Sequence, residues 1–161
     1  MALRPKAVST EARSETAERL CELHQVNLDG GRVFREAARV VSDESVAAIC
    51  DDLSRKRQLY AEELEEYLTE HESEDHESIK TVVHRAWLDL RASFSSDNPA
   101  AVLAEVLRAE KRLRGAYEQV AMALGGSPVL GLIQRHLREL KADMARLTAL
   151  HEAFKRRDAE E

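Results

Sequence analysis

The strongest constraint on this chain is the spacing of its apolar residues, which recur every three or four positions through four long segments. This spacing places them on one stripe of an α-helix, and long segments of this kind are typical of helical bundles. We predict bundle helices over residues 14–41, 43–70, 99–124 and 128–157. No segment alternates with the period of two that a half-buried β-strand shows. The sequence therefore predicts an all-α four-helix bundle.

Short breaks join these helices in pairs. Ser42 and Asp43 can end the first helix and cap the second, which predicts an antiparallel hairpin. Gly125-Gly126-Ser127-Pro128 contains a glycine for a left-handed termination, a serine cap and a proline at a first helical position. It predicts a second hairpin, whose own first helix begins with Asn98 or Asp97 as its cap and Pro99 after it. The bundle domain is expected to cover residues 13–158.

The remaining segments lie before and between the hairpins. Residues 1–12 show no periodicity, and we expect a disordered tail. Residues 69–78 form an acidic connection without an apolar residue. Residues 79–94 form a shorter crossover helix, with Trp87 as the expected anchor of its apolar face. That face consists of Ile79, Val83, Ala86, Trp87, Leu90 and Phe94.

Composition excludes several classes of function. The 161-residue chain is 43% hydrophobic and 34% charged, and its net charge of −6 gives no basic field for a nucleic-acid partner. No apolar run approaches the roughly 20 residues that span a bilayer, and the first 13 residues lack a signal-peptide core. Cys21 and Cys50 lack zinc-ligand spacing and are expected to be buried or half-buried thiols. These features predict a cytoplasmic protein without a membrane partner.

A few polar residues interrupt the apolar stripes, mainly Asn27, Arg57 and Glu110. A buried carboxylate needs a cation, a hydrogen-bond partner or a raised pKa, and a guanidinium can donate two parallel bonds to it. We therefore predict an ion pair between Arg57 and Glu110, with Asn27 or Tyr60 satisfying the remaining groups. Two alternatives stay open at this stage: a metal or substrate site that uses Glu110, or an Arg57 side chain that extends outward to solvent.

The histidines do not form a metal-binding pattern. Ferritin-like metal bundles carry carboxylates and Glu-x-x-His pairs on their inward stripes, and this chain contains no Glu-x-x-His. We expect His24, His84, His136 and His151 to be half-buried packing residues, while His71 and His76 are expected to be solvated in the acidic connection. No nucleophile–base arrangement or phosphate-binding loop is present, so neither an enzyme nor a cofactor is predicted.

Gly30 and Gly31 fall on the inward stripe of the first helix. Each glycine costs about 1 kcal/mol relative to alanine in a helix interior. Their presence indicates the close approach of another helix, for which Trp87 or Tyr117 is the expected neighbour. A small pocket or a local bulge is the alternative.

Four segments resemble one bacterial family, domain of unknown function 2383, over most of the chain from about residue 20 to residue 150. They are residues 27–38, Arg57 with residues 60–64, the His84-Arg85-Ala86-Trp87-Leu88-Asp89-Leu90 run, and residues 103–117 with Glu110 and Tyr117. The resemblance implies a ferritin-like four-helix bundle with two hairpins and a long crossover. The chain departs from the family pattern at Glu77-Ser78, where a Gly-Ser pair is usual, and at Met144, where a histidine would be expected. It supplies no reaction.

We therefore expect a non-enzymatic structural or protein-interaction module without an intact di-metal centre. The resemblance adds a link to bacterial stress responses, and the partner is an unidentified protein or a second copy in a homodimer. The alternative is a metal-binding oxidoreductase or metal-storage protein with an atypical site around Glu110, His24 and His136. A small-ligand carrier that uses space beside Gly30 and Gly31 is a third interpretation.

Overall fold

The computed structural model describes residues 10–69, 81, 84–85, 88 and 96–161, with side chains from residue 14 onward. Four long helices form the structure: α1 (Thr10–Val40), α2 (Glu44–Glu65), α5 (Pro99–Ala123) and α6 (Leu130–Glu160). The described part of the chain contains no β-strand. The predicted all-α four-helix bundle is confirmed. Within the same residues, no helix combines the length and the apolar composition that crossing a membrane requires.

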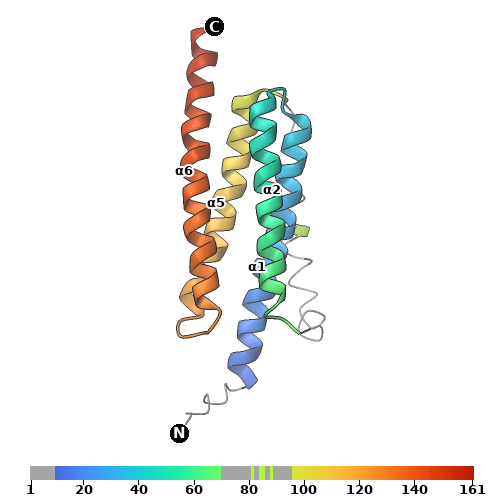
Figure 1. The fold of residues 1–161 in the computed structure, drawn as a ribbon, viewed down its shortest axis with the longest axis vertical. Helices are drawn as coiled ribbons and strands as arrows, with labels where there is room; N and C mark the ends of the chain where they lie inside the picture. Colours follow the sequence, from blue (N-terminus) through green and yellow to red (C-terminus); the bar gives the residue numbers. More distant parts are fainter. Residues whose placement is uncertain (1–9, 70–80, 82–83, 86–87, 89–95) are drawn as a thin grey trace.

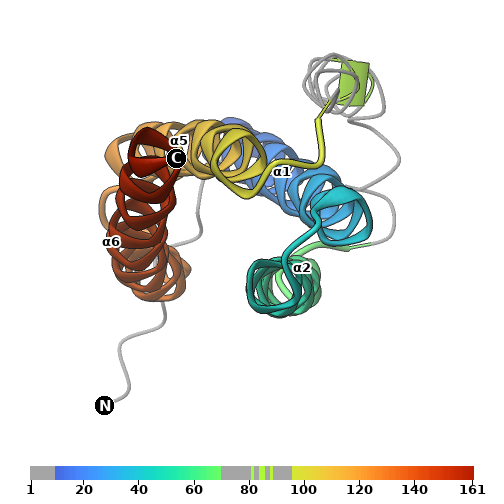
Figure 2. The same ribbon diagram turned by 90° about the horizontal axis from the view of Figure 1, so that it is seen from above.

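The helices are arranged as two hairpins (Figure 1). α1 and α2 form one hairpin and α5 and α6 form the other, while α1 and α5 pack against each other between them. Viewed from above, the four helices follow a curved row in the order α2, α1, α5, α6 (Figure 2). α2 and α6 therefore face each other across the open side of the row, and they approach less closely than the helices within either hairpin.

Local sequence determines where two of the helices begin. The carboxylate of Asp43 accepts a hydrogen bond from the backbone N–H of Val46 at 3.0 Å, and the side chain of Asn98 accepts one from Ala101 at 3.1 Å. Both caps satisfy N–H groups that have no partner within the helix. Pro99 follows Asn98 as the first helical residue. The predicted caps at Asp43 and Asn98 are thus confirmed.

Other helix boundaries differ from the prediction. α1 begins at Thr10, so residues 10–12 are helical instead of belonging to the tail. α2 ends at Glu65 instead of residue 70, because the backbone tightens into a turn in which Tyr67 N–H donates to Leu64 O. The acidic residues near this C-terminus also oppose the helix dipole. α6 begins at Leu130, because Pro128 and Val129 form a turn after Gly126, whose φ of 82° ends the preceding helix as predicted.

The core fills the interior between the two hairpins. Its largest fully buried apolar side chains are Phe34, Leu23, Leu53, Leu64, Leu103, Leu113, Ile133, Leu140 and Leu147. Cys21 and Cys50 are buried within the same interior, as predicted, and burial raises the pKa of the Cys50 thiol to about 12. Gly31 allows α1 to approach α2 closely, because a Cβ there would lie 3.4 Å from the carbonyl oxygen of Ser54. The predicted close approach is confirmed for Gly31. Its nearest described neighbours are Ser54 and Arg57 instead of Tyr117, whereas Trp87 lies outside the described residues.

Most of the segment between the hairpins lies outside the described residues. This applies to the acidic connection beyond Thr69 and to the apolar face predicted for the crossover helix, including Trp87. Thr81, His84, Arg85 and Leu88 are helical, in agreement with the predicted helix at those positions. The Nδ1 atom of His84 lies 2.7 Å from the carboxylate of Asp29, which connects this segment to α1.

Candidate functional site

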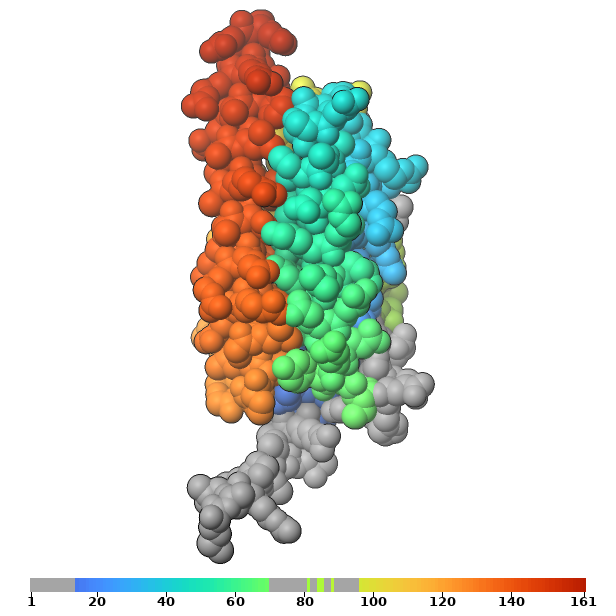
Figure 3. All heavy atoms as spheres, in the orientation of Figure 1, coloured from blue at the N-terminus to red at the C-terminus, as the bar shows by residue number. Residues whose placement is uncertain are grey.

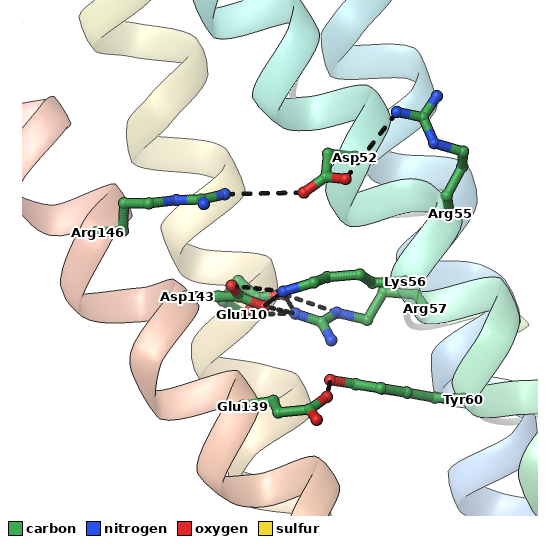
Figure 4. A network of polar contacts seen from close by, with 9 residues as sticks. All are labelled: Asp52, Arg55, Lys56, Arg57, Tyr60, Glu110, Glu139, Asp143 and Arg146. Atoms are coloured by element: carbon green, nitrogen blue, oxygen red, sulfur yellow. Dashed lines mark hydrogen bonds and ion pairs between the residues drawn. The ribbon is translucent and has the colours of Figure 1, made fainter.

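The centre of the bundle contains the predicted ion pair between α2 and α5 (Figure 4). Arg57 donates from Nε to Oε1 of Glu110 at 3.1 Å and from Nη2 to Oε2 at 3.0 Å. Both side chains have no exposed surface. The geometry is the parallel two-bond arrangement that suits a guanidinium and a carboxylate. It excludes an Arg57 side chain that extends outward to solvent.

Two further charged residues complete this cluster, which we call the central charge cluster: Lys56, Arg57, Glu110 and Asp143. Arg57 Nη2 also donates to Asp143 Oδ2 of α6 at 3.1 Å, and Lys56 Nζ lies 3.0 Å from Asp143 Oδ1. With all four groups ionised, the two cations balance the two carboxylates. Since an unbalanced charge in a bundle interior is costly, this balance explains how Arg57, Glu110 and Asp143 can be buried, while Lys56 reaches Asp143 from a partly exposed position.

Burial shifts the pKa values of two residues in the cluster. It raises the pKa of Glu110 to about 7, although Arg57 acts in the opposite direction and Asp143 adds to the increase. Burial alone would lower the pKa of Arg57, but the carboxylates of Glu110 and Asp143, together with Tyr60, raise it above its ordinary value. Arg57 therefore remains charged, and Glu110 is the group whose protonation responds to pH near neutrality.

A second buried chain of hydrogen bonds lies next to the cluster. Asn27 Nδ2 donates to Leu23 O at 2.8 Å and to the hydroxyl of Tyr117 at 2.7 Å. The Tyr117 hydroxyl lies 2.8 Å from His136 Nδ1, and His136 Nε2 lies 3.3 Å from Glu63 Oε1. The chain is satisfied when Tyr117 donates to Nδ1 and Nε2–H donates to Glu63. Burial lowers the pKa of His136 to about 4, so its imidazole is neutral near pH 7.

Tyr60 joins the two networks. Its ring stacks on His136 with 3.9 Å between the ring centroids, and the guanidinium carbon of Arg57 lies 5.0 Å from the same ring. Its hydroxyl donates to Glu139 of α6. Burial and this bond to Glu139 both raise the pKa of Tyr60, so the phenol stays protonated. Asn27 or Tyr60 was expected to help satisfy the remaining groups of the Arg57–Glu110 pair. Tyr60 contacts Arg57 through its ring, whereas the amide of Asn27 bonds to Tyr117 instead.

Polar side chains connect α2 to α6 along the open side of the row (Figure 4). At one end, Asp52 pairs with Arg146 at 3.9 Å. In the middle, Lys56 and Arg57 both contact Asp143, and Tyr60 bonds to Glu139. At the other end, Glu63 contacts Arg135 and His136. We call this set the α2–α6 seam. Figure 3 shows the same side of the molecule, where the atoms of α2 lie against those of α6, whose C-terminal end projects beyond α2. Long polar side chains thus span the gap between the two outer helices.

Within these two networks, two buried atoms have no hydrogen-bond partner among the described residues: Asn27 Oδ1 and Arg57 Nη1. Each belongs to a side chain whose other polar atoms are bonded. The π-face of Tyr60 lies over the guanidinium of Arg57 and partly compensates for the missing hydrogen-bond partner of Nη1. The networks are therefore held by several bonds per side chain and do not depend on these two atoms.

The residues of the alternative metal site have separate partners. Glu110 pairs with Arg57, His136 lies between Tyr117 and Glu63, and the Nε2 atom of His24 lies 3.9 Å from Glu65. Within the described ranges, no group of three or more His, Cys, Asp or Glu side chains has an arrangement that could hold a metal ion. His136 is fully buried instead of half-buried, whereas His84 and His151 are half-buried as expected. His71 and His76 lie outside the described residues.

Sequence reasoning missed Asp143, Glu63, Glu139 and Lys56. Asp143 follows Leu140 by three residues and precedes Leu147 by four, so it falls on the same stripe as those two core leucines. That spacing could have identified it, but the neighbouring Met144 fits the same stripe equally well, because it follows Leu140 by four residues and precedes Leu147 by three. Glu63 and Glu139 border their stripes, and only the tertiary structure shows that they reach across the seam.

The fold and these networks define a four-helix bundle whose described centre is occupied by balanced charges and hydrogen-bonded aromatic side chains. The chain belongs to the family described as Domain of unknown function (DUF2383), whose model matches residues 15–123. That match covers α1 from residue 15 onward and all of α2 and α5, and so includes Asn27, Arg57 and Glu110. Comparisons with curated proteins and with solved structures gave no match.

Proposed function

We propose that this protein is a non-enzymatic, ferritin-like bundle that acts in the bacterial cytoplasm as a structural or protein-interaction module. The observation that carries the proposal is the position of Arg57. Its guanidinium lies without exposed surface between the carboxylates of Glu110 and Asp143. In a ferritin-like metal bundle, inward carboxylates at the centre would bind cations. Here the cation is supplied by the chain.

A metal-binding function is less compatible with these contacts. An incoming divalent ion would have to displace Arg57 from both carboxylates, or bind beside it against electrostatic repulsion. Lys56 adds a second positive charge at Asp143. The imidazole of His136, in the neighbouring hydrogen-bond network, is already bonded to Tyr117 and Glu63. We therefore favour the interaction module over a metal-dependent oxidoreductase or a metal-storage protein.

The outer surface offers contacts for a partner. Leu59 and Tyr67 on the first hairpin are 53% and 50% exposed, and Met122 near the end of α5 is 86% exposed. Scattered apolar residues are common on protein surfaces, whereas aromatic residues and methionine are enriched in interfaces. These residues support contact with a second copy or another protein. The stress-related part of the proposal rests on the sequence resemblance alone.

Sedimentation velocity over a wide concentration range tests this proposal. We expect the wild-type protein to sediment faster as its concentration rises, because exposed Leu59 and Met122 become covered in an oligomer. Leu59→Glu and Met122→Glu should weaken this dependence, whereas Ala48→Glu is a matched control at another exposed position of α2. Wild-type protein that stays monomeric throughout, and that cross-links to no partner in an extract of its host, would contradict the proposal.

A further inference from the structure

Two carboxylates share one nitrogen at the centre of the bundle. Nη2 of Arg57 donates to Glu110 Oε2 at 3.0 Å and to Asp143 Oδ2 at 3.1 Å. The two carboxylates therefore lie within about 6 Å of each other, a range in which like charges hinder each other's ionisation. Glu110 has no exposed surface and Asp143 is 6% exposed, so water screens this repulsion weakly. Full ionisation of both carboxylates therefore depends on the neighbouring cations.

The two cations of the cluster are held in different ways (Figure 4). Arg57 has no exposed surface, makes three hydrogen bonds to the two carboxylates and lies against the ring of Tyr60. Lys56 is 36% exposed, with Nζ at 3.0 and 3.3 Å from the two oxygens of Asp143. An ammonium group is strongly hydrated, and water can replace a partly exposed ion pair at little cost. Lys56 is therefore the cation that can leave the cluster, whereas Arg57 stays.

Other titratable side chains face the cluster or are buried in the helices around it. They are Tyr60 of α2, Tyr117 of α5, Glu139 and His136 of α6, and Asp29 of α1. Burial raises the pKa of both tyrosines and lowers the pKa of His136, so all three are neutral near pH 7. Glu139 accepts a bond from Tyr60, and Asp29 is paired with Arg32 and His84. Since these groups keep their charge near pH 7, a change at Glu110 has to be balanced within the cluster.

We propose that the central charge cluster is a proton-linked switch in which proton uptake by Glu110 releases Lys56 from Asp143 to solvent. When Glu110 binds a proton from water, the cluster holds two cations and a single carboxylate. Lys56 then moves into water and keeps its own proton, and the Arg57–Asp143 pair that remains is again neutral. The pKa of Glu110 is about 7, so the exchange takes place near neutral pH. The switch does not require the proposed interaction function.

The exchange alters the surface of the α2–α6 seam, on which Lys56 lies. Below neutral pH the amine of Lys56 is free in solvent, and above neutral pH it is bound to Asp143. Lysine has a long flexible stem, so rotation of this one side chain is enough and the helices stay in place. The buried proton site at Glu110 is thereby connected to a charge at the molecular surface.

Amine labelling followed by mass spectrometry tests the switch in the full-length protein. A water-soluble acylating reagent is applied briefly from about pH 6 to about pH 8.5, on either side of the Glu110 pKa. Labelling of Lys56 is divided by that of exposed Lys111, which cancels the intrinsic pH dependence of amine reactivity. We expect this ratio to be about two- to fivefold higher at the acidic end, the factor that matches loss of a partly exposed ion pair. The same ratio for exposed Lys141 should stay constant. A constant ratio for Lys56 would overturn the inference.

A substitution that imitates the protonated acid identifies the group that binds the proton. Glu110→Gln keeps the shape of the side chain without its charge, so the Lys56 ratio should be high at every pH. Glu139→Gln is the matched control at a neighbouring carboxylate outside the cluster and should keep the wild-type pH dependence. A Glu110→Gln protein that keeps this dependence would contradict the switch. If that variant does not fold, carboxyl ¹³C NMR of the wild type decides, because Glu110 must titrate at the midpoint of the labelling change. A different midpoint would overturn the inference.

Discussion

Arg57 and Glu110 form a two-bond ion pair at the centre of the bundle, and neither side chain has exposed surface. The pair connects α2 to α5, which occupy diagonal positions across the bundle (Figure 2). Asp143 of α6 bonds to the same guanidinium. Three of the four helices therefore meet at one cation, and its removal should affect the whole bundle.

Loss of Arg57 should be the most damaging change in the central charge cluster. Arg57→Met leaves Glu110 without its cation and weakens the support of Asp143, so we expect a loss of about 3–5 kcal/mol of unfolding free energy. Glu110→Leu should cost less because Arg57 keeps its bond to Asp143. The double variant Arg57→Met/Glu110→Leu should lose less unfolding free energy than Arg57→Met alone. Urea unfolding of the four proteins gives the coupling energy, and a value near zero would show that the pair contributes nothing jointly.

The pH dependence of stability should contain two opposing contributions. The pKa of Glu110 is raised from 4.5 to about 7 in the folded protein, so folding binds a proton, and stability falls as pH rises from about 4.5 to 7. The pKa of His136 is lowered from 6.5 to about 4, so folding releases a proton, and stability rises with pH between about 4 and 6.5. Around pH 5 to 6 the two slopes oppose each other.

Single substitutions separate these contributions. Glu110→Gln removes the falling component, so its stability should rise more steeply between pH 4.5 and 6.5 than that of the wild type. His136→Gln removes the rising component, so its stability should fall over the same interval. Thermal unfolding at a series of pH values measures both. Identical pH profiles for the two variants would contradict the assignment of the two groups.

The hydroxyl of Tyr117 should stabilise the second buried network. Tyr117→Phe removes a partner from both Asn27 Nδ2 and His136 Nδ1, and it should cost about 1–3 kcal/mol. Tyr67→Phe removes a hydroxyl from a half-exposed ring and should change stability by less than about 0.5 kcal/mol. Chemical unfolding compares the two. Equal effects would indicate that the Tyr117 bonds do not stabilise the fold.

Close packing of α1 on α2 can be tested at Gly31. A Cβ at this position lies at contact distance from Ser54, so Gly31→Ala fits, whereas Gly31→Leu requires the two helices to separate and should cost about 1–3 kcal/mol. Gly115 of α5 is the matched control, because a Cβ there meets nothing within 4 Å. Gly115→Ala should stabilise by up to about 1 kcal/mol. A tolerated Gly31→Leu would contradict the close approach.

Much of this fold could be predicted because its determinants are local. The apolar period identifies four helices, and short-range capping chemistry at Asp43 and Asn98 identifies two of their starts. The Arg57–Glu110 pair was also predictable, since a buried charge of each sign requires a partner. The end of α2 was not, because its stripe continues through Leu64 to Leu68 while the backbone turns after Glu65.

The rest of the site depends on tertiary geometry. Asp143 and Met144 are both buried, and their spacing alone does not show that Asp143 reaches Arg57. His136 resembled a half-buried packing residue, but its position between Tyr117 and Glu63 makes it a buried neutral link. Which helix approaches Gly31 also follows from the packing of whole helices, which no local spacing specifies.

We propose that the bundle centre holds its own cations in place of metal ions. Elemental analysis of protein produced in medium supplemented with iron, manganese and zinc tests it most directly. Because Arg57 and Lys56 occupy the carboxylates, we expect far less than one ion per chain, and the same result for Glu110→Ala and for the exposed control Glu62→Ala. One or two ions per chain, lost in Glu110→Ala but kept in Glu62→Ala, would contradict the account.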